Sequence, residues 1–121
     1  MQFSKEQDPV NAIRKYDQAS VWINDQTISG SVAIGPLVIF DDFRCDSIDA
    51  LTVDTLAPLL ATNPEVIVIA TGEQVQFPDA KILRDVQRSG VGIEIMNDGA
   101  AIRTFNVLLS EQREIILALV R

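Results

Sequence analysis

Five residues in the second half of the chain have types that could together hold an anion or another polar ligand. They are Thr71, Gly72, Asn97, Arg103 and Asn106. Backbone N–H groups at turns and helix starts attract anions, and an arginine adds a planar fork of donors. We therefore predict a candidate ligand site in the crevice where these residues meet, beyond the carboxyl ends of the central strands.

The same positions admit an architectural interpretation, which we favour. Threonine and asparagine side chains often bond neighbouring backbone groups, and Gly72 is equally suited to a simple turn. In this interpretation Glu111 pairs with an arginine and, together with Arg113, fixes the turn between a helix and the next strand. Because buried polar groups need partners whatever the function, only a structure decides between the two interpretations.

Familiar catalytic and metal signatures are missing from the sequence. The absence of histidine excludes Ser-His-Asp and Cys-His catalysis and histidine-ligated metals. The turn at residues 71–74 lacks the lysine and hydroxyl pair of a nucleotide P-loop. The carboxylates between Asp41 and Asp54 lack the turn glycine and closing glutamate of an EF-hand. We therefore expect no metal and no cofactor, and the sequence favours a non-catalytic protein over an enzyme built on its few titratable candidates, Glu73, Glu111 and Tyr16.

The totals describe one compact, acidic domain. The chain has 121 residues, 47% of them hydrophobic, and a net charge of −7. This charge disfavours nucleic acid and anionic membranes as partners, and no apolar run reaches the ~20 residues that span a bilayer. The single cysteine, Cys45, predicts an inert thiol in a reducing compartment. We expect a cytoplasmic protein with a loose segment at residues 1–11 and one domain at residues 12–121.

Apolar runs predict the strands that position the candidate residues. Three such runs lie at residues 66–72, 92–96 and 114–120. The first has no polar interruption, which is typical of a strand buried on both faces. Short β-branched runs between residues 20 and 40 are separated by turn residues and predict a meander of hairpins, with Gly30 at a turn or bulge.

Three helices are predicted between and after these runs. They lie at residues 56–62, 79–89 and 99–110. Thr55 is expected to cap the first, with Pro58 in its first turn, and Asn97 or Asp98 to cap the last. Strands alternating with helices indicate a layered α/β domain whose neighbouring strands run parallel through right-handed crossovers.

Several short motifs also follow one another in a familiar order. They are Ile69-Ala70-Thr71-Gly72, Gly92-Ile93-Glu94-Ile95-Met96, the segment 101–108, and Glu111-Gln112-Arg113. Over residues 12–120 the chain resembles the Mth-type domain family, whose members are small proteins described as a domain of unknown function. The family usually has glycine at positions 70 and 112, where this chain has alanine and glutamine. Relatives include an adipogenesis-associated cytosolic protein and mitochondrial complex I assembly factor 3.

The resemblance implies a fold and a direction for function. It implies a three-layer single α/β domain with a central mixed sheet, flanking helices and a β-hairpin layer, and no agreed enzymatic activity. We expect a non-catalytic accessory protein that binds a protein partner and assists assembly of a respiratory or other membrane complex. The alternative is a small-molecule or anion-binding module using the crevice beyond the central strands. A homodimer through the hairpin layer is compatible with either, since exposed strand edges need covering.

Overall fold

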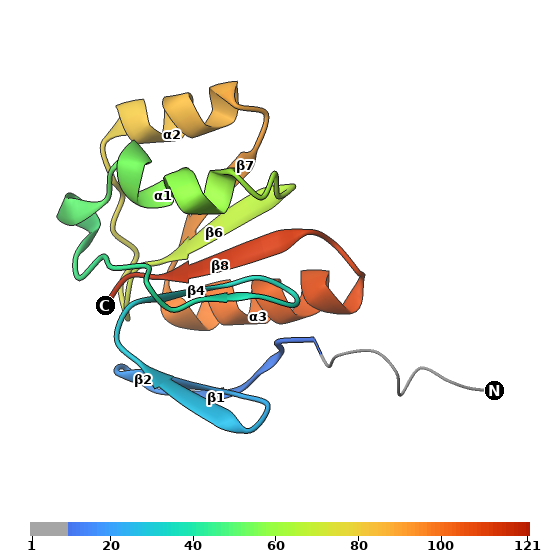
Figure 1. Ribbon diagram of the computed structural model, residues 1–121. Helices are drawn as coiled ribbons and strands as arrows, with labels where there is room; N and C mark the ends of the chain where they lie inside the picture. Colours follow the sequence, from blue (N-terminus) through green and yellow to red (C-terminus); the bar gives the residue numbers. More distant parts are fainter. Residues whose placement is uncertain (1–9) are drawn as a thin grey trace.

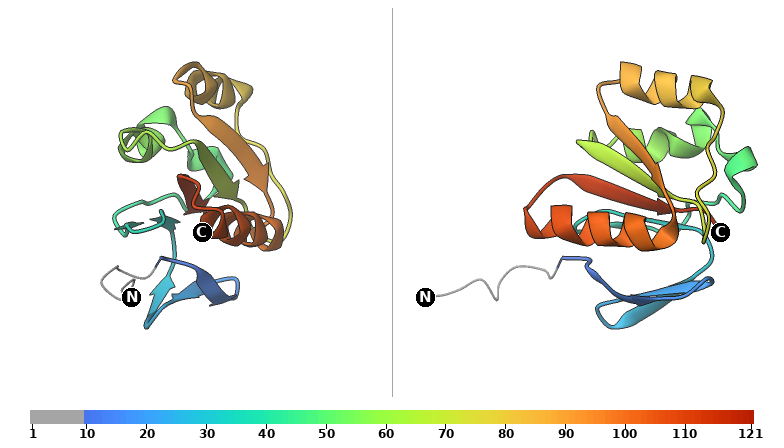
Figure 2. Two further views of the ribbon diagram at one scale, coloured as in Figure 1. Left: turned by 90° about the vertical axis from the view of Figure 1, so that its right-hand side faces the viewer. Right: turned by 180° about the vertical axis from the view of Figure 1, so that it is seen from behind.

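A computed structural model describes residues 10–121 and shows a three-layer α/β domain. Figure 1 shows two helices, α1 and α2, on one face of a central sheet, and α3 on the other face. A second, smaller sheet lies on the same side of the central sheet as α3 and shares a core with it, as Figure 2 shows from two further directions. The predicted mixed sheet with flanking helices and a hairpin layer is confirmed.

The central sheet has five strands in the order β5-β4-β8-β6-β7. Their bounds are Val32–Ile34 for β4, Ile39–Phe40 for β5, Val66–Ala70 for β6, Gly92–Met96 for β7 and Ile115–Leu119 for β8. β6 runs parallel to both β7 and β8, whereas β4 runs antiparallel to β8 and to β5. The sheet is therefore mixed. The predicted apolar run at 66–72 contains β6, which lies between two parallel neighbours, whereas β8 is the middle strand of the sheet.

Successive side chains of the central strands pack alternately into two hydrophobic cores, one on each face of the sheet. Ile67 and Ile69 of β6 pack against α1 and α2, whereas Val68 and Ala70 face α3 and the smaller sheet. Side chains alternate across a strand, so a strand covered on both faces needs apolar residues at every position. This explains why β6 and β8 carry unbroken apolar runs.

The helices begin at polar caps. Their bounds are Val53–Leu60 for α1, Ala80–Arg88 for α2 and Asp98–Ser110 for α3, and a short 3₁₀ turn, η2, spans Ile48–Ala50. The predicted start of α1 is wrong by one helical turn. Thr52, not Thr55, is its N-cap and accepts the Thr55 N–H at 3.1 Å, which places Pro58 inside the helix rather than in its first turn. Asn97 caps α3 as predicted, accepting the Ala100 N–H at 2.9 Å.

The smaller sheet contains β1 (Ile13–Tyr16), β2 (Ser20–Ile23) and β3 (Gln26–Ser29) in that order. The predicted single meander over residues 20–40 is therefore wrong in one respect, because the chain changes sheets after β3. Gly30 has a φ of 83° at this crossing, a conformation that favours glycine. β1 has no predicted counterpart, because only its first residue is buried and its sequence lacks the alternation that marks a strand.

The N-terminal segment joins the domain at Asn11. Its side chain donates to the Gly35 carbonyl at 3.0 Å, and its N–H donates to the Pro36 carbonyl at 2.9 Å. Asn11 is therefore buried, although the sequence places it in the loose segment, and residues 1–9 of that prediction lie outside the described residues. No helix within residues 10–121 combines the length and apolar character needed to cross a bilayer.

Candidate functional site

The carboxyl ends of β6, β7 and β8 lie at the same end of the central sheet. In the parallel register Ala70 pairs with Met96 on one side and with Leu119 on the other. The residues that follow these strands therefore come together, as the sequence predicts for Thr71–Gly72 and Asn97. Ligands of open α/β sheets usually bind at such an end, so each side chain there needs a full account of its partners.

Thr71 uses its polar groups within the turn that it begins. Its N–H donates to the Met96 carbonyl at 3.0 Å. Its hydroxyl donates to the Gln74 carbonyl and accepts the Gln76 N–H, both at 3.0 Å. The residue is 8% exposed, so its hydroxyl shapes the segment after β6.

Gly72 connects β6 to the start of α3. Its N–H donates to Asp98 Oδ1 at 2.8 Å, and its carbonyl accepts the Asp98 N–H at 2.8 Å. Its φ of 103° is strained for any residue with a Cβ. The glycine is therefore required by the turn, and its backbone groups are already paired with Asp98.

Asn106 and Arg103 both lie on α3, but the side chain of Asn106 contacts β1 and that of Arg103 is exposed. The Asn106 side chain accepts the Ile13 N–H and donates to the Ile13 carbonyl, both at 3.0 Å, and so fixes β1 against the helix. Arg103 is exposed, and a Cβ added at Gly99 would lie 3.4 Å from its Nη1 and 3.1 Å from the Tyr16 hydroxyl. The two side chains hold different places along the helix.

The five candidates do not share one cavity. Gly72 lines a pocket of about 310 Å³, and Asn97 lines a neighbouring pocket of about 380 Å³. Thr71, Arg103 and Asn106 line neither of these two pockets. Hydrogen bonds within the domain account for Thr71, Asn97 and Asn106, which agrees with the architectural interpretation of those residues.

Sequence reasoning missed the most unusual polar group at this end, the side chain of Arg121. Its Nη2 lies 3.0 Å from Asp98 Oδ2, and the two side chains are only 7% and 11% exposed. Its Nε and Nη1 are buried and have no hydrogen-bond partner in the described part of the chain. Strand direction could have placed Arg121 here. It follows β8, and a residue that follows a strand parallel to β6 lies at the same end of the sheet as Thr71.

The turn after α3 differs from its predicted pairing. Arg113 Nε donates to Glu65 Oε1 at 2.7 Å, so Glu65, and not Glu111, is the acidic partner. The arginine side-chain hydrogen bond and the Glu114 N–H lower the pKa of Glu65, and Glu65 in turn raises the pKa of Arg113. Both side chains are about half exposed, so this pair adds little stability.

Gln112 occupies the left-handed position that ends α3. Its φ is 62°, its N–H donates to the Leu109 carbonyl, and the Arg113 N–H donates to the Leu108 carbonyl, both at 3.0 Å. This is the geometry in which helices usually end on glycine. The glycine that the resembled family has here therefore serves backbone conformation, and glutamine adopts the same turn at some strain.

Neither a reactive thiol nor a metal cluster is found in the described residues. Cys45 is buried, its Sγ lies 3.1 Å from the Ser47 carbonyl, and burial raises the pKa of the thiol. A raised pKa disfavours the nucleophilic thiolate, in agreement with the predicted inert thiol. Within residues 10–121 no group of three or more acidic or cysteine side chains is placed to hold a metal ion.

A second candidate region lies at the β5 edge of the central sheet. Leu37 is 65% exposed and Val38 is 48% exposed in the turn between β4 and β5. Two pockets of about 210 Å³ flank this edge. Leu37 and Val38 line one of them together with Pro36, Pro64, Ile115 and Ile116, and the apolar lining residues of the other are Phe40, Phe43, Pro58 and Leu59.

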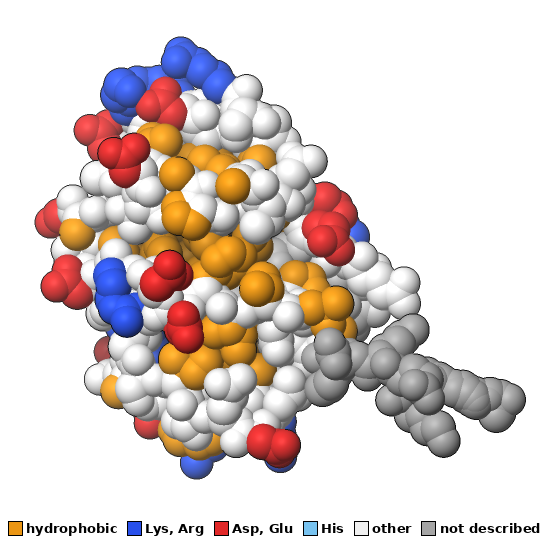
Figure 3. All heavy atoms as spheres, viewed as in Figure 1, with side chains coloured by type: hydrophobic (Ala, Val, Ile, Leu, Met, Phe, Trp, Pro, Cys, Tyr) orange, Lys and Arg blue, Asp and Glu red, His pale blue; other side chains and the backbone are white. Residues whose placement is uncertain are grey.

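We call Leu37, Val38 and these apolar lining residues the β5 surface. Figure 3 shows apolar side chains gathered across the middle of this face, with acidic side chains between and around them. Asp42 belongs to one pocket and Glu114 to the other. No strand of the described chain pairs with the outer edge of β5. An exposed apolar patch beside an open strand edge is typical of an interaction surface.

Two curated relatives show what the chain is similar to. It is 33% identical over 72 residues to a 13 kDa major membrane protein of Francisella tularensis, covering 60% of this chain and 58% of the relative. It is 29% identical over 110 residues to NADH dehydrogenase [ubiquinone] 1 alpha subcomplex assembly factor 3 of Xenopus tropicalis, covering 89% of this chain and 60% of the relative. The chain thus spans about three fifths of the length of these relatives.

Solved structures and a family model agree on the fold. The NMR structure of Xanthomonas campestris XCC1710 is 35% identical with a TM-score of 0.82, covering 90% of this chain and 83% of that one. The solution NMR structure of a Mth938-like domain protein of Bordetella pertussis is 23% identical with a TM-score of 0.75, covering 94% and 89%. The model of the family described as "Protein of unknown function (DUF498/DUF598)" matches residues 13–120. Since that match takes in the whole layered domain, the chain belongs to the DUF498/DUF598 family.

Proposed function

We propose that this chain is a non-catalytic accessory protein that binds a protein partner through the β5 surface. The observation that carries the proposal is the exposure of Leu37 and Val38 beside an edge strand without a partner in the described chain. A partner segment that pairs with β5 would cover the strand edge and place side chains in the two flanking pockets. Burial of exposed apolar area would supply the main driving force.

Charge narrows the kind of partner that fits this surface. Among the described residues, Glu114 is the only charged one that lines one pocket, whereas Asp42 and Arg44 both line the other, and the whole chain carries a net charge of −7. Complementary charge on a partner speeds association and disfavours wrong partners. The proposed partner therefore carries a basic residue opposite Glu114, next to the apolar ones that enter the pockets.

The names of the relatives support a role in assembly. Assembly factor 3 of Xenopus tropicalis and of Danio rerio match 89% and 96% of this chain, each at 29% identity. An assembly role requires recognition of other proteins and needs no catalytic group of its own. We propose that the chain assists assembly of a respiratory or other membrane complex, with the β5 surface as its contact.

Affinity purification with matched variants tests the proposal. The chain is expressed near its endogenous level as wild type, Leu37→Asp and Val107→Asp, where Val107 is a comparably exposed apolar residue on α3 at 55%. We expect one protein to co-purify reproducibly with wild type and Val107→Asp and to be lost from Leu37→Asp. Recovery of the chain alone, or equal recovery by Leu37→Asp, would reject the β5 surface as the contact.

Self-association through the same surface is a distinct outcome. Analytical ultracentrifugation of the purified chain measures it without other proteins. A dimer that Leu37→Asp converts to a monomer would mean that a second copy, and not another protein, covers the β5 surface.

A further inference from the structure

Arg121 holds a buried cation whose hydrogen-bonding capacity is mostly unused. Its side chain is 7% exposed, and Asp98 accepts from Nη2 alone. Nε and Nη1 are buried without a partner in the described residues. Buried donors on a guanidinium nearly always have an acceptor in native proteins, so an acceptor from outside the described chain is expected.

Hydrogen bonds hold the main chain of Arg121 in place. Its N–H donates to the Cys45 carbonyl at 2.9 Å, and its carbonyl accepts the Ser31 hydroxyl at 2.6 Å. Ser31 Oγ also accepts the Cys45 N–H at 3.1 Å. Three segments distant in sequence, after β8, before β4 and before η2, are thereby fixed around one point.

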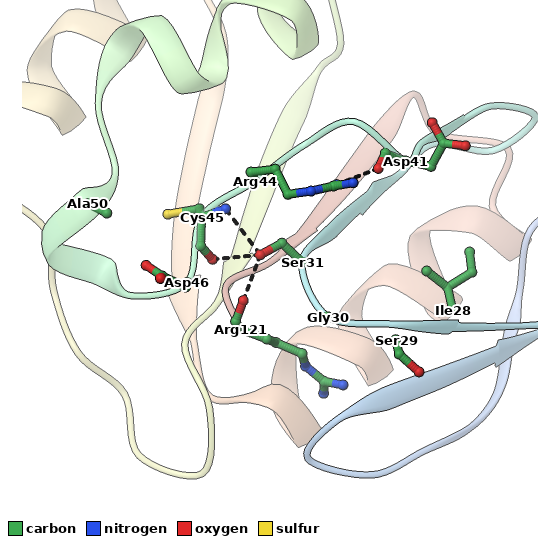
Figure 4. Close-up of a pocket in the computed structure, with 10 residues that line it drawn as sticks. All are labelled: Ile28, Ser29, Gly30, Ser31, Asp41, Arg44, Cys45, Asp46, Ala50 and Arg121. Atoms are coloured by element: carbon green, nitrogen blue, oxygen red, sulfur yellow. Dashed lines mark hydrogen bonds between the residues drawn. The ribbon is translucent and has the colours of Figure 1, made fainter.

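A pocket of about 500 Å³ opens beside this point. Its polar and charged lining residues are Ser29, Ser31, Asp41, Arg44, Asp46 and Arg121. Figure 4 shows the Arg121 guanidinium extending toward Ser29 below Gly30, on the other side of Ser31 from Asp46. One water molecule takes up about 30 Å³ in the liquid, so the pocket has room for a ligand of several non-hydrogen atoms.

The charges of the lining decide which ligand fits. Arg44 and Arg121 balance Asp41 and Asp46, and Asp98 already pairs with Arg121. A free anion would add a negative charge to a site in which carboxylates outnumber guanidinium groups. A net-neutral molecule avoids that repulsion, because its oxygen atoms accept from Arg121 while its N–H groups donate to Asp46 or Asp41.

We propose that this pocket binds a small net-neutral molecule with carboxylate or amide oxygens at one end and amino or amide N–H groups at the other, as in an amino acid or a short peptide. Protein atoms cover Nε and Nη1, so binding includes a turn of the guanidinium toward the pocket while Nη2 keeps its contact with Asp98. The site adjoins the β5 surface, because Arg44 lines both this pocket and one of the two pockets beside β5, but Arg121 and Asp46 line neither pocket of that surface.

NMR titration of the amide N–H signals tests the site directly. Glycine and diglycine are the net-neutral probes, and acetate and inorganic phosphate are the anionic ones. In wild type we expect glycine or diglycine at millimolar concentration to shift the Gly30, Ser31 and Cys45 signals, at least tenfold more tightly than acetate or phosphate. Stronger binding of glycine would assign an amino acid, and stronger binding of diglycine a peptide.

Two variants and one control separate a ligand site from a structural role. Arg121→Gln should weaken binding of the effective probe at least tenfold, whereas Arg103→Gln, which changes an exposed arginine on α3, should leave it unchanged. If Arg121→Gln fails to fold, Asp46→Asn serves, because it keeps the Arg121–Asp98 pair and should still weaken binding. Absence of shifts with both neutral probes, or equal binding of acetate, would overturn the proposal and leave ordered water as the acceptor.

Discussion

Two regions of this domain handle their polar and apolar groups in opposite ways. At the carboxyl ends of β6, β7 and β8, polar side chains bond the turns that carry them, and Asp98 joins Gly72 to Arg121. At the β5 edge, apolar side chains remain exposed and the strand edge is open in the described chain. Polar groups of the first region are thus mostly paired within the domain, whereas apolar groups of the second remain exposed.

The contrast shows that position in the fold alone does not identify a functional site. The strand ends are where α/β proteins commonly bind ligands, yet Thr71 and Asn97 bond backbone groups of the same domain there. The β5 edge has no sequence motif, and our proposal for it rests on exposed apolar residues and on a strand edge without a partner in the described chain. The first prediction below tests how firmly the strand ends are built, and the next three test contacts elsewhere in the domain against that standard.

The largest effect is expected from removing the charge of Asp98. In Asp98→Asn the amide still accepts the Gly72 N–H, but the buried Arg121 loses its counter-charge. We expect a loss of about 3 kcal/mol in the free energy of unfolding, measured by urea denaturation. Asp85→Asn, which breaks an exposed pair with Lys81 at 2.7 Å, should change stability far less. Equal losses of unfolding free energy in the two variants would show that the buried Asp98–Arg121 pair stabilises the domain no more than an exposed ion pair does.

A smaller effect is expected when the hairpin layer loses its anchor on α3. Asn106→Ala leaves the N–H and carbonyl of Ile13 without their partner. Unpaired, partly buried backbone groups should lower the free energy of unfolding by about 2 kcal/mol. Hydrogen exchange at Ile13 should accelerate in parallel, whereas Ser110→Ala on the same helix should leave it unchanged. Unaltered exchange at Ile13 would mean that apolar packing alone holds β1.

A gain in stability is expected at the end of α3. Gln112 has a φ of 62°, and a left-handed backbone costs a residue with a Cβ about 1 kcal/mol. Gln112→Gly should therefore raise the free energy of unfolding by about that amount, and Gln112→Ala should give no gain. A neutral or destabilising Gln112→Gly would show that the glutamine side chain compensates for its backbone in a way that the structure does not reveal.

The smallest effect concerns pH. Hydrogen bonds from Arg113 and from the Glu114 N–H lower the pKa of Glu65 in the folded protein below the ordinary value of 4.5. A group with a lowered folded pKa stabilises the fold above its unfolded pKa and loses that contribution as the pH falls through the folded pKa. Stability should thus fall below pH 4.5, with a shallower slope in Glu65→Gln. If wild type and Glu65→Gln lost stability with the same slope, Glu65 would make no contribution to acid unfolding.

Much of the fold could be predicted because β6, β7 and β8 are governed by local pattern. Their apolar runs need no knowledge of the rest of the chain. The start of α1 was harder, since Thr52 and Thr55 are both good caps and their hydroxyls lie 2.8 Å apart in the structure. β1 escaped prediction because α3, through Asn106, holds it from 93 residues away.

The site was less predictable for the same physical reason. The role of Arg121 depends on Asp98, 23 residues away, and on packing that buries both side chains. The open edge of β5 likewise depends on which strands pair in the folded sheet, and Leu37 is exposed in the turn that leads to this strand. Contacts between distant segments decide both features, and a single sequence carries no direct record of them.

Site-specific photo-crosslinking tests the central claim most directly. A photoreactive residue is placed at Val38 in the β5 surface or, as the control, at exposed Arg103 near the strand ends, and each protein is irradiated in native lysate. The account predicts one reproducible protein crosslink from position 38, competed by excess wild-type chain, and none from position 103. A crosslink from position 103 alone, or no competed crosslink from position 38, would contradict it.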